Sequence, residues 1–255
     1  MSAALRVEAL KLRRATAAWV AALAVVLGVP ALSAGLPAAA RANGDSLLAA
    51  KVAGMVTGTG WDAVLALAAQ VVSIGALLAS GVLVSWCFGR ELAEHRLAGL
   101  TSLPVGRDRI AWAKTVVLLA WGAATVVAAA AASVVAGVVT GLGAPGADEL
   151  GGVGRVLAVG MLSVLLAVPL SLAASALRGY LPGVSVLLGI VVVTQVVTLS
   201  GAGAWFPWAA PGMWAGMGGP ELARSVTPVQ LALPVAVAAA SAWGTARWWR
   251  RAPVI

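Results

Sequence analysis

The sequence predicts an all-α, polytopic membrane protein with six transmembrane helices in a single membrane domain, residues 1–255. The chain is 61% hydrophobic and 10% charged, and its mean hydropathy is +0.98, far outside the range of soluble globular proteins. A bilayer core of roughly 30 Å takes about 20 helical residues, and a transmembrane barrel would instead show short alternating segments. The charged residues leave six uncharged intervals of at least 22 residues each: 15–40, 63–89, 115–147, 156–177, 179–220 and 225–246.

The chain begins with a basic lead-in helix, "ALRVEALKLRR" at residues 4–14, which precedes the first apolar run. The small-residue stretch "PAAARA" after that run could suit a signal peptidase. The 14-residue lead and the run of about 20 apolar residues favour a retained anchor. The spans are predicted near 17–36, 63–87, 110–139, 154–177, 183–200 and 228–246.

The distribution of Lys and Arg predicts that both termini are cytoplasmic in a multi-pass protein of the cell membrane. Basic residues cluster at span ends and form no stripe on a soluble face, which argues against nucleic-acid binding. With six spans, 13 basic residues fall inside: Arg6, Lys11, Arg13, Arg14, Arg90, Arg96, Arg107, Arg109, Lys114, Arg178, Arg247, Arg250 and Arg251. Four fall outside: Arg41, Lys51, Arg155 and Arg224.

Residues 89–109, "GRELAEHRLAGLTSLPVGRDR", form the most polar long segment and hold the only histidine, His95. On a helix over 91–103, the apolar residues share an arc of about 140°, and Pro104 ends the helix. Such a helix either lies on the membrane surface or docks a soluble partner. The apolar arc comprises Leu92, Ala93, Leu97, Leu100 and Leu103, opposite Glu91, Glu94, His95, Thr101 and Ser102.

Between the last two spans, residues 201–220 are too rich in Pro and Gly for a regular helix. A seventh span here would also move "RWWRR" to the outside. We therefore expect an extracellular interfacial or re-entrant element, with Trp205, Trp208 and Trp214 at headgroup depth.

Several kinds of chemistry have no support in the sequence. The three lysines follow Leu, Ala and Ala, so no Walker A loop is present. The spans contain no cluster of His, Cys, Asp or Glu, so we expect no metal, no catalytic residue and no cofactor bound by this chain; Cys87 is a lone apolar residue. Among the neutral polar residues of the spans, Gln70 and Gln195 are the weak candidates for a substrate path.

The stretch "FGRELAEHRLAGLTSLPVGRDRIAWAK", residues 88–114, resembles the first cytoplasmic loop of ABC transporter permeases of the second (export-permease) type. The opening residues 4–14 resemble the lead-in helix of that family, and "FPWAAPGMW", residues 206–214, is similar to its Pro-Trp element. His95-Arg96 stands where the family often has Gly-Thr, and Gly106 where Ser is common. The matching loop residues are Phe88, Glu91, Leu100, Leu103, Pro104, Val105, Arg107, Ile110 and Lys114.

The resemblance implies a permease subunit of an ATP-driven exporter for a hydrophobic or amphipathic compound such as a drug, antibiotic peptide or lipid. Two copies of a separate ABC ATP-binding subunit would hold ATP and Mg, and a second permease chain, identical or related, would complete the path. The implied lead-in residues are Glu8, Lys11, Arg13 and Arg14. The implied coupling residues are Glu91, Glu94, Leu97, Leu100, Leu103, Pro104, Arg107 and Lys114.

Two other functions compete with this interpretation. A membrane immunity or signalling protein would bind its ligand without transporting it. A membrane enzyme would need a loop residue such as Glu94 or His95 to act without visible partners.

Overall fold

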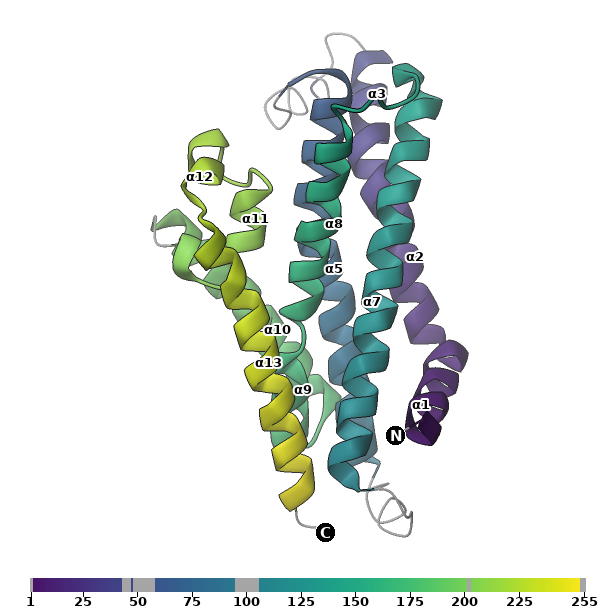
Figure 1. The fold of residues 1–255 in the computed structure, drawn as a ribbon, viewed down its shortest axis with the longest axis vertical. Helices are drawn as coiled ribbons and strands as arrows, with labels where there is room; N and C mark the ends of the chain where they lie inside the picture. The colour runs from purple at the N-terminus through teal and green to yellow at the C-terminus, as the bar shows by residue number, and fades with distance from the viewer. Residues whose placement is uncertain (1, 43–46, 48–57, 95–105, 201–202, 253–255) are drawn as a thin grey trace.

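The computed structural model describes residues 2–42, 47, 58–94, 106–200 and 203–252, and all regular structure in these ranges is helical (Figure 1). The longer helices run side by side along one axis, and both termini lie at one end of the bundle, here called the terminal end. The helices are α1 (Ser2–Arg14), α2 (Thr16–Pro30), α3 (Leu36–Ala42), α5 (Gly60–Ala93), α7 (Arg107–Gly137), α8 (Leu150–Leu165), α9 (Pro169–Ala176), α10 (Tyr180–Leu199), α11 (Ala210–Trp214), α12 (Pro220–Ser225) and α13 (Pro228–Arg251). Shorter π or 3-10 segments cover Ala31–Gly35, Val138–Leu142 and Gly203–Trp205.

Six helical segments of the described chain are long and apolar enough to cross a membrane, which confirms the predicted fold class. An even number of spans agrees with two termini at the same end of the bundle. The second and third segments extend well beyond the predicted 63–87 and 110–139. The candidate spans are Thr16–Ala39, Gly60–Ala93, Arg107–Leu142, Leu150–Ala176, Tyr180–Thr198 and Pro228–Arg251.

Helix α5 is the central element of the bundle, and α10 is peripheral. In the most apolar 18-residue stretch of each helix, 61% of α5 but only 11% of α10 is buried within the chain. Many apolar side chains of α10 therefore face outward, as lipid contact or a second chain would require. Its exposed residues include Leu181, Leu188, Val192, Val193 and Val196.

The fourth candidate span is broken, whereas the sequence analysis treated 154–177 as one helix. Pro169 lacks an N–H group and its ring clashes with the preceding turn, so α8 ends at Leu165 and α9 begins at Pro169. The break leaves the Leu166 carbonyl outside the helical ladder, and Trp208 Nε1 donates to it at 3.1 Å. The carbonyl freed by the break thus finds its hydrogen-bond donor in Trp208, a residue of the element before the last span.

Trp208 was expected at headgroup depth, yet its partner Leu166 follows the whole of α8. A helix of 16 residues is about 24 Å long, so Trp208 reaches well into the bundle. Trp205 is exposed, and Trp214 packs against the guanidinium of Arg155 at 5.5 Å. How deep the element lies in a bilayer stays a prediction.

Helices α9 and α13 are joined by hydrogen bonds between buried side chains near the terminal end. Ser171 Oγ and Thr245 Oγ1 lie 2.8 Å apart, and Trp249 Nε1 donates to Ser175 Oγ at 2.9 Å. The Trp249 ring also meets Phe88 of α5 edge-on, with 5.7 Å between ring centroids. Phe88, a residue of the resemblance, is thus fully buried where α5 and α13 meet.

Glycine at position 89 allows a close backbone approach of α5 to the turn between α9 and α10. A Cβ built on Gly89 would overlap the backbone of Gly179 and Tyr180, which cannot rotate away as a side chain could. We expect Gly89→Ala to destabilise the protein by about 1–3 kcal/mol, the usual effect of overpacking. The measurement is thermal denaturation of the purified chain in detergent.

Gly75→Ala, in the same helix, is the matched control. A Cβ at Gly75 would meet only Val25 Cγ2 at 3.9 Å, an ordinary contact. Helix propensity alone favours alanine over glycine at both positions, so an equal loss of stability in both variants would show that the close approach at Gly89 does not set the effect.

Candidate functional site

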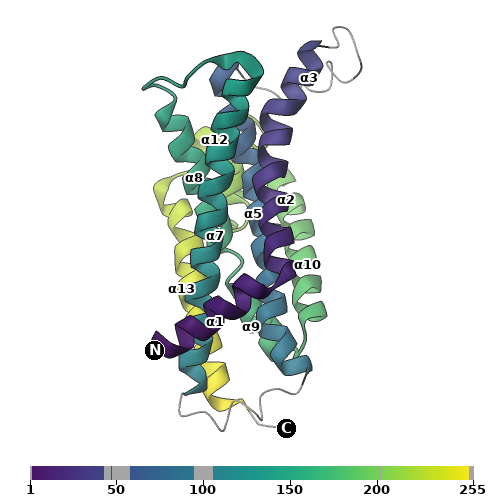
Figure 2. The same cartoon turned by 90° about the vertical axis from the view of Figure 1, so that its right-hand side faces the viewer.

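Helix α1 lies across the terminal end of α7 at a large angle to the bundle axis (Figure 2). Its direction changes at Ala15, whose extended backbone separates α1 from α2. The Arg13 carbonyl at the end of α1 accepts a hydrogen bond from Trp19 Nε1 at 2.9 Å, which satisfies a group that the helix leaves unpaired. Glu8 and Leu12, one turn apart, both point from α1 into the bundle and are buried.

Four side chains from α1, α5 and α7 form one ion cluster, defined as Glu8, Lys11, Glu91 and Lys114. Lys114 Nζ lies 2.8 Å from Glu91 Oε1 and 2.9 Å from Glu8 Oε2. Lys11 Nζ lies 2.7 Å from Glu8 Oε1 and 3.1 Å from Glu91 Oε1. Each lysine therefore bridges both carboxylates, and the four formal charges cancel.

The two lysines differ sharply in burial although they share the same partners. The Lys114 side chain is 3% exposed and that of Lys11 is 47% exposed. Lys114 Nζ also lies 3.5 Å from the Cys87 carbonyl and 6.0 Å from the Phe88 ring centroid. A buried ammonium is tolerated only where it is paired and hydrogen-bonded, so Lys114 requires α1 to lie where it does.

A second set of contacts, the α7–α13 clamp, joins Arg107 and Asp108 to the end of α13. Arg107 Nη1 donates to the Ala252 carbonyl at 2.7 Å, and Nη2 donates to the Arg250 carbonyl at 3.3 Å. Arg250 Nη2 in turn lies 2.9 Å from Asp108 Oδ2. These bonds satisfy carbonyls at the C-terminal end of α13.

The structure assigns different surroundings to the coupling residues expected from the sequence. Glu91 belongs to α5, which continues to Ala93, so no separate helix begins at 91. Glu94 caps α5 and lies 3.6 Å from Arg90 Nε. Glu91 and Lys114 are buried, and within the described residues they contact each other and α1 rather than pointing outward. Leu97, Leu100, Leu103 and Pro104 lie outside the described residues.

Of the remaining predicted site residues, Arg13 and Arg14 are exposed at the end of α1. Gln195 lines a cavity of about 120 Å³ together with Ser73 and other residues of α5, α10 and α11 and with Trp208 of the turn before α11. Gln70 lies instead beside Gly216, where a Cβ would be 3.3 Å from its Nε2.

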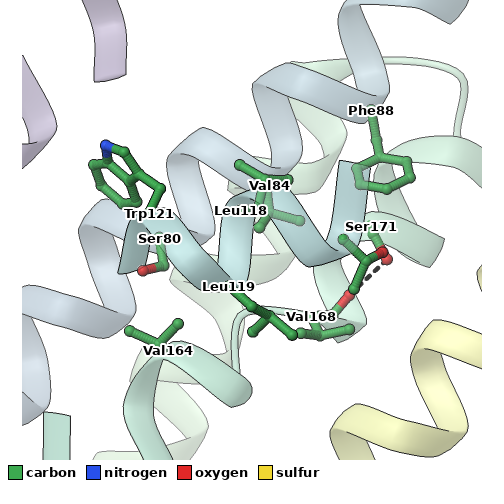
Figure 3. A pocket seen from close by; sticks show the side chains of 10 residues that line it. Ser80, Val84, Phe88, Leu118, Leu119, Trp121, Val164, Val168 and Ser171 are labelled. Carbon is green, nitrogen blue, oxygen red and sulfur yellow. Dashed lines mark hydrogen bonds between the residues drawn. The ribbon is translucent and has the colours of Figure 1, made fainter. Parts of the chain in front are cut away.

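A small void lies at the break of the fourth span, between α5, α7, α8 and α9 (Figure 3). Its volume of about 10 Å³ is that of a single water-sized probe. Ser171 turns its hydroxyl to the Val168 carbonyl at 2.7 Å, as the dashed line in Figure 3 shows. The void is too small for a cargo, so this part of the bundle is packed core.

A family model described as ABC-2 family transporter protein matches residues 4–196. The chain belongs to the ABC-2 transporter family. ABC-2 permeases lie in the lipid bilayer and generally work with ATP-binding subunits. A search of curated proteins found no match.

The ABC-2 match includes all four residues of the ion cluster and both residues that α7 contributes to the clamp. It ends within α10, so the Pro-Trp element at 206–214 and helix α13 lie beyond it. The resemblance of residues 206–214 to the Pro-Trp element of the family therefore has no support from the family match and depends only on the sequence of that stretch.

Sequence reasoning selected the four cluster residues separately and missed their contact. The available signal was Lys114, because an ionisable residue beside a long apolar run needs a counter-ion. The bond from Trp208 to the break was also missed, although Pro169 inside a predicted span marked the place where backbone carbonyls would need other donors.

The ion cluster predicts unequal effects for its two lysines. Lys114→Met would leave two buried carboxylates with only Lys11, so we expect a loss of about 3–5 kcal/mol in the free energy of unfolding. Lys11→Met removes a half-exposed partner of the same carboxylates, and we expect about 0.2–1 kcal/mol. Thermal denaturation and the rate of proteolysis within α1 measure both effects.

The double variant Lys114→Met/Glu91→Gln removes one charge of each sign and should recover more than half of the loss. Similar losses for Lys114→Met and Lys11→Met would contradict the assignment of a buried, charge-bearing Lys114.

Proposed function

We propose that this chain is the membrane-spanning permease subunit of an ATP-driven exporter, oriented with both termini in the cytoplasm. The observation that carries the proposal is that residues 95–105 are flanked by two sets of contacts, the ion cluster and the α7–α13 clamp, here called the two joints. Glu91 of the ion cluster precedes this segment, and Arg107 of the α7–α13 clamp follows it. The same segment is the one whose sequence resembles the ATPase-docking loop of the family.

The two joints give a physical route for coupling. The ion cluster ties α1, α5 and α7 together, and the clamp ties α7 to α13. A force on residues 95–105 would therefore reach four helices directly. ATP-driven closure of two partner subunits would tilt these helices between inward-open and outward-open states.

The energy source in this proposal is a separate polypeptide. The sequence contains no Walker A loop, and the ABC-2 family generally works with ATP-binding subunits. The chain itself is thus a transport subunit and not an enzyme, and ATP with Mg would bind to its partner.

A second permease chain, identical or related, would enclose the path. The void at the break holds only a water-sized probe, while α10 presents an apolar, outward face. A hydrophobic or amphipathic cargo fits a path of this kind, since the cavity beside Gln195 combines amide and hydroxyl groups with Leu77, Met213 and Met217.

The docking step is tested with Leu97→Asp/Leu100→Asp. If these leucines insert into a groove of the ATPase, two buried charges should weaken capture of the co-expressed ATP-binding subunit at least 100-fold. The measurement is affinity purification of the complex in detergent.

The matched control is Thr101→Asp/Ser102→Asp, which adds the same charge on the side of the predicted helix opposite the leucines. Undiminished capture by the leucine variant would remove this segment from the interface, and equal losses in both variants would show that the leucine face has no specific role in docking.

Transport is tested by reconstitution in proteoliposomes. The chain with its ATP-binding subunit should move a hydrophobic fluorescent dye on addition of ATP and Mg. The chain alone, or paired with an ATPase whose Walker A lysine is replaced, should move none. Protection of cells by the pair with the inactive ATPase would instead favour a ligand-binding immunity protein.

A further inference from the structure

A hollow of about 450 Å³ opens beside the ion cluster, between the α1–α2 corner and the end of α5. The charged side chains that line it are four basic and two acidic: Lys11, Arg14, Arg90, Lys114, Glu8 and Glu91. Because the two lysines already neutralise the two carboxylates, the remaining positive charge resides on Arg14 and Arg90. The hollow is therefore a basic site.

The two arginines are placed to receive an anion. Arg14 is exposed and forms no hydrogen bond or ion pair with the described residues. Arg90 stacks on the Trp86 ring at 4.6 Å from its centroid, and its ion pair with Glu94 is long, 3.6 Å. A guanidinium held on an aromatic face keeps its N–H groups directed along the plane, where a phosphate can bind.

The position of the hollow selects the kind of anion. Thr16, which begins the first candidate span, lies at its edge, and the second candidate span ends just beyond Arg90. Its apolar walls are formed by Trp86, Val117 and Leu118. A basic pocket between helices at the end of membrane spans matches the headgroup of a membrane lipid.

An apolar groove between α2 and α7 adjoins the hollow. Leu12 and Val117 line both, and the groove of about 620 Å³ continues along side chains such as Trp19, Leu23 and Trp121. Trp19 and Leu23 are largely exposed, so the groove faces the surroundings of the bundle. It offers acyl chains a surface that begins at the basic site.

We propose that this hollow binds an anionic phospholipid, with its phosphate between Arg14 and Arg90 and its acyl chains against α2 and α7. The ion cluster forms the floor of the hollow. It also holds α1 in position, and α1 forms one wall of the hollow. The bound lipid would link α1 to the end of α5, a few residues before the segment 95–105. This site does not require that the chain transport any cargo.

The experiment is native mass spectrometry of the full chain in detergent, titrated with phosphatidylglycerol or with phosphatidylcholine of the same acyl chains. We expect tight binding of one phosphatidylglycerol and at least tenfold weaker binding of phosphatidylcholine. Arg14→Ala/Arg90→Ala should weaken phosphatidylglycerol binding about 10- to 30-fold, as expected for two basic contacts at a membrane surface.

The control, Arg6→Ala/Arg251→Ala, removes the same charge from exposed arginines of α1 and α13 that do not line the hollow. Equal weakening in both variants would overturn the proposal in favour of a diffuse surface potential. Displacement of the lipid by millimolar inorganic phosphate would also overturn it, because the apolar contacts would then contribute nothing. The proposal would also be overturned if Arg14→Ala/Arg90→Ala dissociated a second protein chain and left lipid binding unchanged, because the hollow would then be a protein interface.

Discussion

The buried ammonium of Lys114 is the constraint on which the terminal end of this protein depends. A charge removed from water costs several kcal/mol unless oppositely charged groups surround it, and Lys114 obtains Glu8 in addition to Glu91 only if α1 crosses α7. Glu8 therefore fixes where α1 lies, and Glu91 fixes how α5 meets α7. The same pairing neutralises the floor of the neighbouring hollow, so that only its arginines remain to attract an anion.

The interior of the bundle meets a different requirement, since backbone groups in a membrane must find partners within the protein. Pro169 ends α8 inside the bundle, and the freed Leu166 carbonyl is satisfied by Trp208. On the other side of the break, hydroxyls of α9 bond to α13. The break is thus stabilised from two directions, by the element before the last span and by the last span itself.

The sequence was sufficient for properties that depend on single residues and their spacing. Six apolar runs were enough for the helical class, and the charged residues between them marked the joints at Glu91 and Arg107. It was insufficient where distant residues meet. The contact of Glu8 with Lys114 spans 106 positions, and that of Trp208 with Leu166 spans 42. Neither follows from periodicity: the first depends on the angle at which α1 crosses α7, and the second joins two turns, one at the break of the fourth span and one just before α11.

The two joints beside residues 95–105 differ in strength, and this difference bears on the proposed coupling. Charges in the ion cluster are largely withdrawn from water, so separating α1, α5 and α7 there would expose uncompensated buried groups. The clamp consists of an ion pair in which the Arg250 side chain is 67% exposed, which contributes little to stability, and of two Arg107 bonds that are exposed or only partly buried. A force arriving through residues 95–105 would therefore move α1, α5 and α7 as one body and change its angle to α13. Because α13 is also bonded to α9, that change would reach the broken fourth span, where the helix is already interrupted at Pro169 and can bend without breaking a continuous ladder of helical hydrogen bonds.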